Sequence, residues 1–411
     1  DKSELIRLQL DKFNKHLDET PFNNQMKLLT GKRDASNPLY LSLAVEELRA
    51  HGQFESLSAK IRELPIKMNL LLDYTLERLE NEFGRKYLST AFMFICAARD
   101  GLLEFELKQL LQLYFSVESS NLLDKLVELS ALRDREILVG RLFKEQKTSG
   151  ATSTAKFLSF LDSIGKVFLK PRSASSATSL IALKANELVE NAVRNRYGTD
   201  RQDISTEQAH KIMALFYWHS IDKSFEGSWS SNERALLYLP YHLLNANAFA
   251  EFIHVTCNMS FISIKCQLGL ALSLMDDFDL YKSSTPRNVL LDTAVRARKQ
   301  RVRVQQSESL ESMIVESERF RDYKQFILTN YHLLRSNPKL AYQQAINQPD
   351  SSWPSRDLGE LLRKSLSINA LGSFFEWANK PQGNNVAPPT RFDDFSTAVC
   401  CAVISENGRV V

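Results

Sequence analysis

The chain has 411 residues, which predicts two to four domains at roughly 100–200 residues per domain. Its 14 glycines and 12 prolines are too few for the frequent tight turns of an all-β protein, so a mainly α fold is expected. With 25% charged and 44% hydrophobic residues the composition excludes a disordered or collagen-like chain, and a net charge of +3 does not indicate a nucleic-acid binder.

The first 83 residues have the spacing of helices. Leucines and a phenylalanine near helical spacing predict helix within residues 1–30. Asn37 before Pro38 predicts a helix start, because asparagine is a good N-cap and proline suits the first helical position. This helix should run to about Ala50. A further helix follows from an apolar series at intervals of four, three and four residues: Leu72, Leu76, Leu79 and Phe83.

Two short helices separated by a glycine come next. Residues 86–98 read as a buried helix, Gly101 interrupts it, and an amphipathic helix follows at about Glu104–Tyr114. This arrangement predicts a helix-turn-helix. The second helix carries two glutamates and one lysine, whereas a recognition helix facing phosphates should be basic, so we expect a packing module. Residues 143–157 are polar and rich in Ser and Thr, and predict a loop.

A small hairpin is predicted after that loop. The β-compatible stretches 166–170 and 179–183 flank a plausible turn at 171–177. A helix over 184–196 follows. Two helices, a hairpin and a closing helix together predict a winged-helix domain over residues 84–205.

The remainder is predicted to be a helical array, a linker and a β unit. Helix follows helix from residue 206 to 281, as in superhelical arrays, and 283–315 is polar and basic with little periodicity. Helices resume at 320–334 and 338–346. Two segments rich in Pro, Gly, Asn and Ser then predict a linker, and the segment beyond it predicts strand, turn at Asn407-Gly408, and strand.

One run of cations is a candidate nucleic-acid contact. Five cations lie within eight positions and could bind phosphate backbones or an import receptor: Arg296, Arg298, Lys299, Arg301 and Arg303. Acidic neighbours such as Glu308 and Glu311 favour the alternative of a solvated insertion, and aromatic residues are not interleaved with the cations.

Catalytic and metal motifs are not recognisable. The segment Thr30-Gly-Lys-Arg-Asp34 resembles part of a phosphate-binding loop, but that motif would need Gly at Met26 and Ser or Thr at Arg33. Cys257 and Cys266 lie near His254 in an apolar stretch, so we expect buried thiols and no metal site. Few cysteines without a Cys-x-x-Cys pair are typical of a reducing compartment, and no apolar run reaches the roughly 18 residues of a membrane-spanning helix.

The order of these segments resembles STAND-type NACHT NTPases followed by WD repeats. The strings NPLYLSLAVEELRAHGQFE (37–55) and LPYHLLNANAF (239–249) carry the resemblance, together with the final strand–turn–strand unit. The resemblance implies a NACHT tail at 1–33, a helical subdomain at 34–83, a winged helix at 84–205, a helical array at 206–346, a linker at 347–390 and the start of a propeller at 391–411.

The resemblance also implies roles for two residues. In this class the proline of the helical subdomain packs on adenine, and Pro38 matches it, although a helix start alone explains this proline. A winged-helix histidine that senses nucleotide phosphate is replaced by Asn186, which cannot become a cation and puts a nucleotide switch in doubt. We expect no cofactor to be bound by this chain alone, and ATP to be possible only in a longer protein.

The string ETPFNNQMKLLTGKRDASNPLYL (19–41) is similar to the members of this class that are components of telomerase and vault ribonucleoproteins. A non-catalytic scaffold segment is therefore expected, with protein partners on the array and propeller, telomerase or vault RNA bound by a module outside this chain, and a nuclear and cytoplasmic location. The alternative is a nephrocystin-3-like or other ATP-dependent STAND signalling scaffold. Because the chain starts at Asp1, we expect it to be part of a longer protein.

Overall fold

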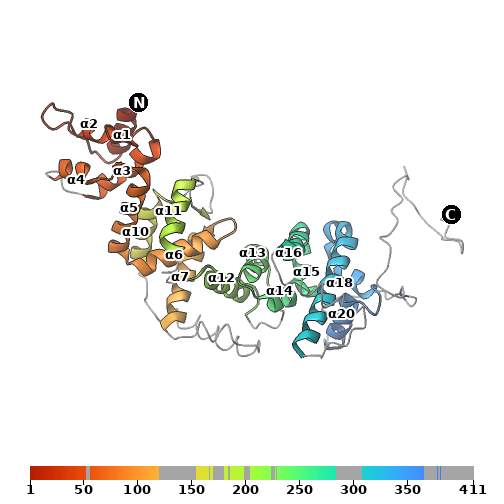
Figure 1. The fold of residues 1–411 in the computed structure, drawn as a ribbon. Helices are drawn as coiled ribbons and strands as arrows, with labels where there is room; N and C mark the ends of the chain where they lie inside the picture. The colour runs from red at the N-terminus through yellow and green to blue at the C-terminus, as the bar shows by residue number, and fades with distance from the viewer. Residues whose placement is uncertain are drawn as a thin grey trace, which may run out of the picture. The chain divides into compact units, whose positions relative to one another are not determined.

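The fold is that of a computed structural model (Figure 1). It describes residues 1–51, 56–119, 154–165, 167–169, 180–183, 186–198, 204–223, 227, 229–283, 308–364, 377 and 380. These residues are mainly helical with one small sheet, which confirms the predicted mainly α class. The chain divides into two compact units, residues 1–252 and 253–411. No helix in the described ranges is long and apolar enough to cross a membrane.

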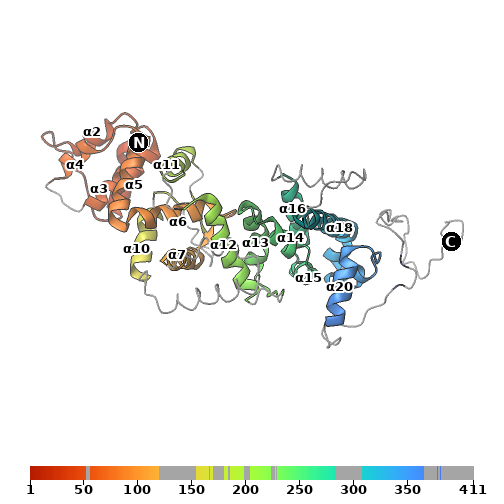
Figure 2. The ribbon, with the colours of Figure 1, turned by 60° about the horizontal axis from the view of Figure 1, so that its bottom comes forward.

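Five helices form the first part of the N-terminal unit. They are α1 (Lys2–Asp11), α2 (Gln25–Thr30), α3 (Pro38–His51), α4 (Leu57–Glu63) and α5 (Met68–Phe83). Helix α3 is central, because it packs against α1, α4 and α5 (Figure 2). The predicted helix starting at Pro38 is confirmed, as is the one carrying Leu72 to Phe83, whose four apolar side chains are all buried.

A mixed segment follows α5. Its elements are α6 (Arg85–Ala97), β1 (Leu102–Leu103), α7 (Glu104–Ser119), α10 (Thr154–Gly165), β2 (Leu180–Ile181) and α11 (Glu187–Tyr197). Strands β1 and β2 are antiparallel, with Leu102 opposite Ile181, and a separate bridge joins Leu169 to Leu183. This bridge connects the two stretches predicted to form a hairpin.

Gly101 allows β1 to reach β2. Its φ of +87° is a backbone conformation that side chains with a Cβ rarely adopt. A Cβ at this position would lie 2.8 Å from the carbonyl oxygen of Ile181 and 3.2 Å from the Cβ of Ala182. The glycine predicted to interrupt the helix therefore also permits the close approach of two chain segments 80 residues apart.

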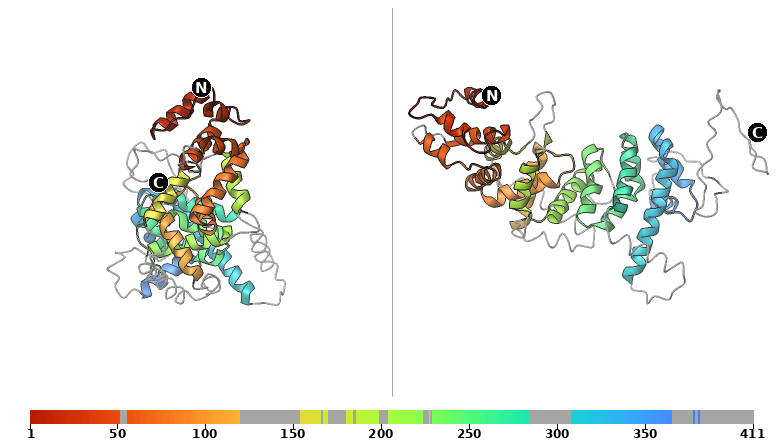
Figure 3. Two further views of the ribbon diagram at one scale, coloured as in Figure 1. Left: turned by 90° about the vertical axis from the view of Figure 1, so that its left-hand side faces the viewer. Right: turned by 45° about the horizontal axis from the view of Figure 1, so that its top comes forward.

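Helices continue from α12 onward. The N-terminal unit holds α12 (Thr206–Ile221) and α13 (Glu233–Asn245), which pack side by side (Figure 3). Helix α14 (Phe249–Thr256) contains the point of division. The second unit holds α15 (Met259–Gln267), α16 (Ala271–Ser283), α18 (Glu308–Ser336), the 3₁₀ turn η1 (Pro338–Leu340), α19 (Ala341–Ile346) and α20 (Trp353–Lys364).

Three predicted non-helical stretches contain helix. The predicted loop 143–157 is helical from Thr154, because α10 buries Phe157, Phe160, Leu161 and Ile164 at helical spacing. The Ser- and Thr-rich composition concealed this periodicity. The polar stretch 283–315 contains the first residues of α18. Within the range predicted as linker, residues 353–364 form α20, which buries Leu358 and packs on α18 and α19. The predicted final strands lie outside the described residues.

Candidate functional site

Pro38 is the first residue of α3. The side-chain oxygen of Asn37 accepts a hydrogen bond from the backbone N–H of Leu39 at 2.9 Å, which is the predicted N-cap contact. Pro38 itself is exposed. The missing N–H of proline costs nothing at this position, because the first turn of a helix leaves its N–H groups without intrahelical partners. Local helix chemistry therefore explains the proline, and its contact with adenine remains a prediction.

Asn186 is the N-cap of α11. Its side-chain oxygen accepts from the backbone N–H of Leu188 at 3.0 Å. Pro38 and Asn186 therefore both lie at helix starts, on α3 and α11, and both of these helices pack against α5. The side-chain oxygen of Asn186 is thus engaged in capping the helix, and the role of this residue towards a nucleotide remains a prediction.

Lys32, the lysine of the segment that resembles a phosphate loop, has a structural role. Its ammonium donates to the carbonyl oxygens of Arg62 at 3.1 Å and Leu64 at 2.6 Å. Burial lowers the pKa of this lysine. Met26, which stands where the motif requires glycine, is buried in α2, and Arg33 stands where it requires Ser or Thr. The ammonium of Lys32 is thus engaged within the fold, between the end of α2 and the end of α4.

The other predicted contacts are placed only in part. The five cations from Arg296 to Arg303 lie outside the described residues. Cys257 and Cys266 are free thiols and are buried, as predicted. Burial raises the pKa of Cys266 to about 11, so it is a poor nucleophile at neutral pH. Among the described residues, no three His, Cys, Asp or Glu side chains are grouped so as to hold a metal ion.

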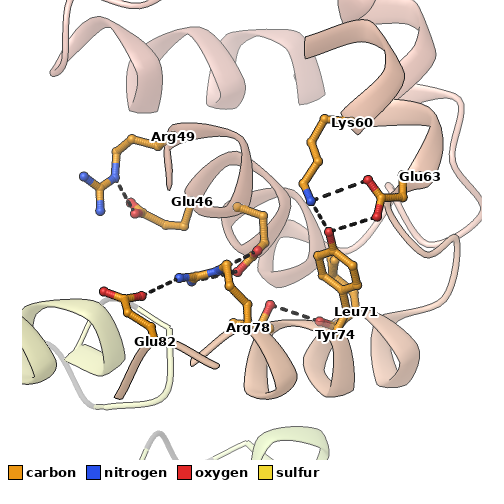
Figure 4. Close-up of polar contacts among 10 residues, drawn as sticks. Glu46, Arg49, Lys60, Glu63, Leu71, Tyr74, Arg78 and Glu82 are labelled. Atoms are coloured by element: carbon orange, nitrogen blue, oxygen red, sulfur yellow. Dashed lines mark hydrogen bonds and ion pairs between the residues drawn. The ribbon is translucent and has the colours of Figure 1, made fainter. Parts of the chain in front are cut away.

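Three arginine–glutamate pairs in the N-terminal unit have carboxylates that are 0–10% exposed. The first joins α5 to α3. Arg78 Nε lies 2.9 Å from Glu47 Oε2, and Arg78 Nη2 lies 2.9 Å from Glu47 Oε1. The Glu47 side chain is 0% exposed. Arg78 also donates to Glu82 at 3.1 Å (Figure 4), so one guanidinium connects a buried carboxylate with an exposed one.

The second pair joins α11 to α5. Arg196 donates to both carboxylate oxygens of Glu80 at 2.8 Å, and the Tyr197 hydroxyl donates to the same carboxylate at 3.0 Å. Burial alone would raise the pKa of Glu80, but hydrogen bonds from Arg196 and Tyr197 outweigh burial and lower this pKa. Because Glu80 and Arg196 are 116 residues apart, the pair fixes α11 on a distant helix.

The third pair joins α13 to α7 and β1. Arg234 Nε and Nη2 lie 3.0 and 2.9 Å from the two carboxylate oxygens of Glu106. Arg234 also donates to the carbonyl oxygen of Gly101 at 3.1 Å, and Glu106 accepts from the backbone N–H of Leu103 at 2.7 Å. The Glu106 side chain is 3% exposed. One ion pair therefore connects the glycine turn, the start of α7 and the start of α13.

The three pairs follow one another through the unit. The first lies within the segment 34–83, the second connects that segment to residues 84–205, and the third connects 84–205 to the helices after residue 206. Arginine suits such contacts because its planar guanidinium binds both carboxylate oxygens at once. The arrangement is a structural linkage between segments, and it contains no nucleophile paired with a base.

Sequence reasoning did not single out these six residues. The sequence does indicate that Glu47 and Glu106 are unusual, because each occupies a position on an otherwise apolar helix face. Glu47 is four residues after Leu43, and Glu106 is four residues before Leu110. A charged residue at such a position indicates a buried pair. The arginine partners lack a comparable signal, because two of them come from segments more than 100 residues away.

The fold and these contacts define a class: a mainly helical, multi-segment protein whose consecutive segments are joined by buried ion pairs. The chain is similar to telomerase protein component 1 of Rattus norvegicus, with 27% identity over 383 residues that cover 93% of this chain and 13% of the relative. The Mus musculus protein of the same name is 27% identical over 387 residues, again 93% of this chain and 13% of the relative. The chain thus spans about an eighth of the length of these curated relatives. No family model matches the chain.

Proposed function

We propose that this chain is a non-catalytic interaction segment of a large scaffold protein related to telomerase protein component 1. The similarity over 93% of the chain carries this proposal. The related proteins are named as telomerase components, so the proposed setting is a ribonucleoprotein complex. The proposed location is the nucleus and cytoplasm.

The proposed architecture within this scaffold is the NACHT-associated helical subdomain at 34–83, the winged helix at 84–205 and the helical array from 206. The winged helix is supported by its element order: α6, β1, α7, α10, the Leu169–Leu183 bridge and β2. In a winged helix the wing is a hairpin, which corresponds here to the chain between Leu169 and Leu183. Strand β2 lies in the second arm of this hairpin and pairs with β1. The proposal places the WD-repeat propeller from 391 onward.

In the proposed scaffold, protein partners bind the helical array and propeller, and RNA is bound by residues outside this chain. ATP binding, if the longer protein has it, would likewise need residues beyond those seen here, since Lys32 and Asn186 are engaged in structural contacts. The alternative of an ATP-dependent STAND signalling scaffold shares this architecture and differs in its partners.

The experiment uses the full chain as bait for affinity purification from mouse cell extract, with and without ribonuclease. The expected result is enrichment of telomerase or vault proteins that persists after ribonuclease treatment, because protein contacts carry the association. A second bait carries Arg234→Met, which removes the ion pair between α13 and α7. Comparing the two baits shows whether binding depends on the linkage between these segments. Absence of these proteins from both samples contradicts the proposal, and enrichment of signalling or ciliary proteins instead supports the alternative.

The basic run provides a second test. In the first variant, glutamine replaces all five cations: Arg296, Arg298, Lys299, Arg301 and Arg303. If RNA is bound by residues outside this chain, as proposed, any RNA binding by the native chain and its salt dependence should be the same in this variant. The matched control replaces five exposed lysines with glutamine: Lys2, Lys12, Lys27, Lys67 and Lys223. A loss of affinity with a flatter salt dependence, seen only in the first variant, would assign direct RNA binding to this run.

A further inference from the structure

Two buried histidines face each other between α12 and α13. The Nδ1 atoms of His210 and His242 are 2.9 Å apart, a hydrogen-bonding distance. The two residues are 4% and 1% exposed. They come from helices that pack along one another and are 32 residues apart in the chain. The contact is therefore a direct polar link across the interior of the helix pair.

Hydrogen-bond chemistry restricts the protonation of this pair. A neutral imidazole carries one donor nitrogen and one acceptor nitrogen. For an Nδ1–Nδ1 bond, one ring must carry its proton on Nδ1 and the other on Nε2. One added proton can still be accommodated, because the acceptor ring keeps its Nδ1 lone pair. A second added proton leaves two N–H donors facing each other at 2.9 Å, so the bond is lost and two cations repel.

The surroundings are largely aromatic. Tyr217 stacks on His242 with ring centres 5.6 Å apart, and Tyr241 contacts His210 edge-on at 5.7 Å. Aromatic rings exclude water and supply no carboxylate to stabilise an imidazolium. A cation between these helices is therefore poorly compensated.

Several charged groups on the neighbouring elements are paired with one another or lie against aromatic rings. On α12, Glu207 pairs with Lys211 at 2.5 Å. Arg234 of α13 pairs with Glu106 of α7. After α6, the Arg99 guanidinium lies 5.7 Å from the centre of the Tyr241 ring. The carboxylate of Asp100 interacts electrostatically with the hydroxyl groups of Tyr238 and Tyr241. The other ionisable groups on these elements include Glu233 at the start of α13, Glu104 and Lys108 of α7, Arg85, Lys86 and Cys96 of α6, and His219 near Lys223 at the end of α12.

We propose that the His210–His242 pair is a proton-operated switch of the α12–α13 helix pair. With neutral rings the histidines join the two helices. With both rings protonated they force the helices apart and admit water to the aromatic interior. The switch depends on the geometry of this contact and is independent of the proposed scaffold function.

The sign of the pH dependence follows from linkage. Burial lowers the pKa of His210 to about 4, and burial together with His210 lowers the pKa of His242 well below its ordinary value. Histidine in the unfolded chain has a pKa of about 6.5. Between these values the unfolded state binds more protons than the folded state. The pair therefore stabilises the fold fully above pH 6.5, and this stability is lost as pH falls toward about 4.

The test compares chemical denaturation of the full chain from pH 7.5 to 4.5 with that of a double variant, His210→Leu with His242→Phe. Two protons linked to unfolding raise the unfolding equilibrium constant by up to about 100-fold per pH unit. We therefore expect the unfolding equilibrium constant of the native chain to change by up to about 100-fold more per pH unit than that of the double variant. The contribution of His219 is present in both and cancels. His16→Gln is the control, since His16 is exposed and should leave the native steepness unchanged.

Nitrogen NMR of the native chain gives a readout that does not depend on a variant folding. The expected spectrum at pH 7 shows one Nδ1–H and one Nε2–H tautomer at these residues, with neither ring titrating near pH 6.5. Equal steepness in the native chain and a folded double variant overturns the proposal. Two rings of the same tautomer, or two rings that titrate near 6.5, overturn it as well.

Discussion

Arg234 contacts three chain segments at once, and this explains why single residues matter in the N-terminal unit. Its guanidinium neutralises Glu106 and caps the carbonyl of Gly101, while Glu106 holds the backbone of β1. A buried charge that loses its partner is costly, whereas an exposed pair contributes little because water and salt screen it. The energetic weight of an ion pair here therefore depends on the exposure of its carboxylate.

Replacing Arg234 with methionine should destabilise the chain by about 3 kcal/mol, because Glu106 then stays buried without its cation. Chemical denaturation measures this free energy. The control is Arg7→Met, which removes a pair that is even shorter, at 2.7 Å, but whose side chains are 54% and 45% exposed. An equal change in denaturation midpoint for the two variants would contradict the argument from burial.

The pair of Glu80 with Arg196 predicts a specific pH dependence. The pKa of Glu80 is lowered in the folded state, so the pair contributes stability above the ordinary glutamate pKa of about 4.3, and this contribution is lost as pH falls. In Arg196→Met, burial should instead raise the pKa of Glu80, so the variant loses stability as pH rises. The difference in unfolding free energy between the two proteins should therefore grow from pH 3 to pH 7. A difference that is constant with pH would disprove this account.

Among the secondary-structure elements, the helices begin at residues with capping side chains, whereas the two strands pair where the backbone at Gly101 approaches Ile181 closely. Asn37, Ser205 and Asn232 each cap a helix through a side-chain oxygen. Strand β1 has only two residues, so its pairing with β2 depends on the preceding glycine turn rather than on strand length. We therefore expect the pairing of β1 with β2 to be sensitive to substitution of Gly101.

Gly101→Ala should destabilise the chain by more than about 1 kcal/mol, because alanine disfavours the positive φ and its Cβ meets the Ile181 carbonyl. Gly165→Ala is the matched control. No atom lies within 4 Å of a Cβ built there, so this variant should be neutral or slightly more stable. Thermal denaturation distinguishes the two, and equal stabilities for both variants would show that the turn tolerates a side chain.

At the scale of the whole molecule, each compact unit has its own buried core and its own buried ion pair. In the second unit Lys265 Nζ lies 2.6 Å from Asp277 Oδ2, with side chains 0% and 1% exposed, and this pair connects α15 with α16. Separate cores predict that the units respond separately to destabilisation.

Hydrogen exchange followed by mass spectrometry tests that expectation. Lys265→Met should accelerate exchange in α15 and α16 and leave α5 and α7 unchanged. Arg234→Met should do the reverse, accelerating exchange in α7 and α13 and sparing α16. Acceleration throughout the chain in either variant would show that the two units unfold as one.

Local sequence patterns correctly predict the mainly helical class, the start of α3 at Pro38, the apolar face of α5 and the burial of Cys257 and Cys266. Capping and helical periodicity act over a few residues, so they can be read from neighbours in the chain. Tertiary structure alone decided the partners of Glu80 and Glu106, the Nδ1 contact of His210 with His242 and the pairing of β1 with β2. These contacts join residues 32 to 128 positions apart, and a pairing over such distances depends on how the helices pack, which no local pattern specifies.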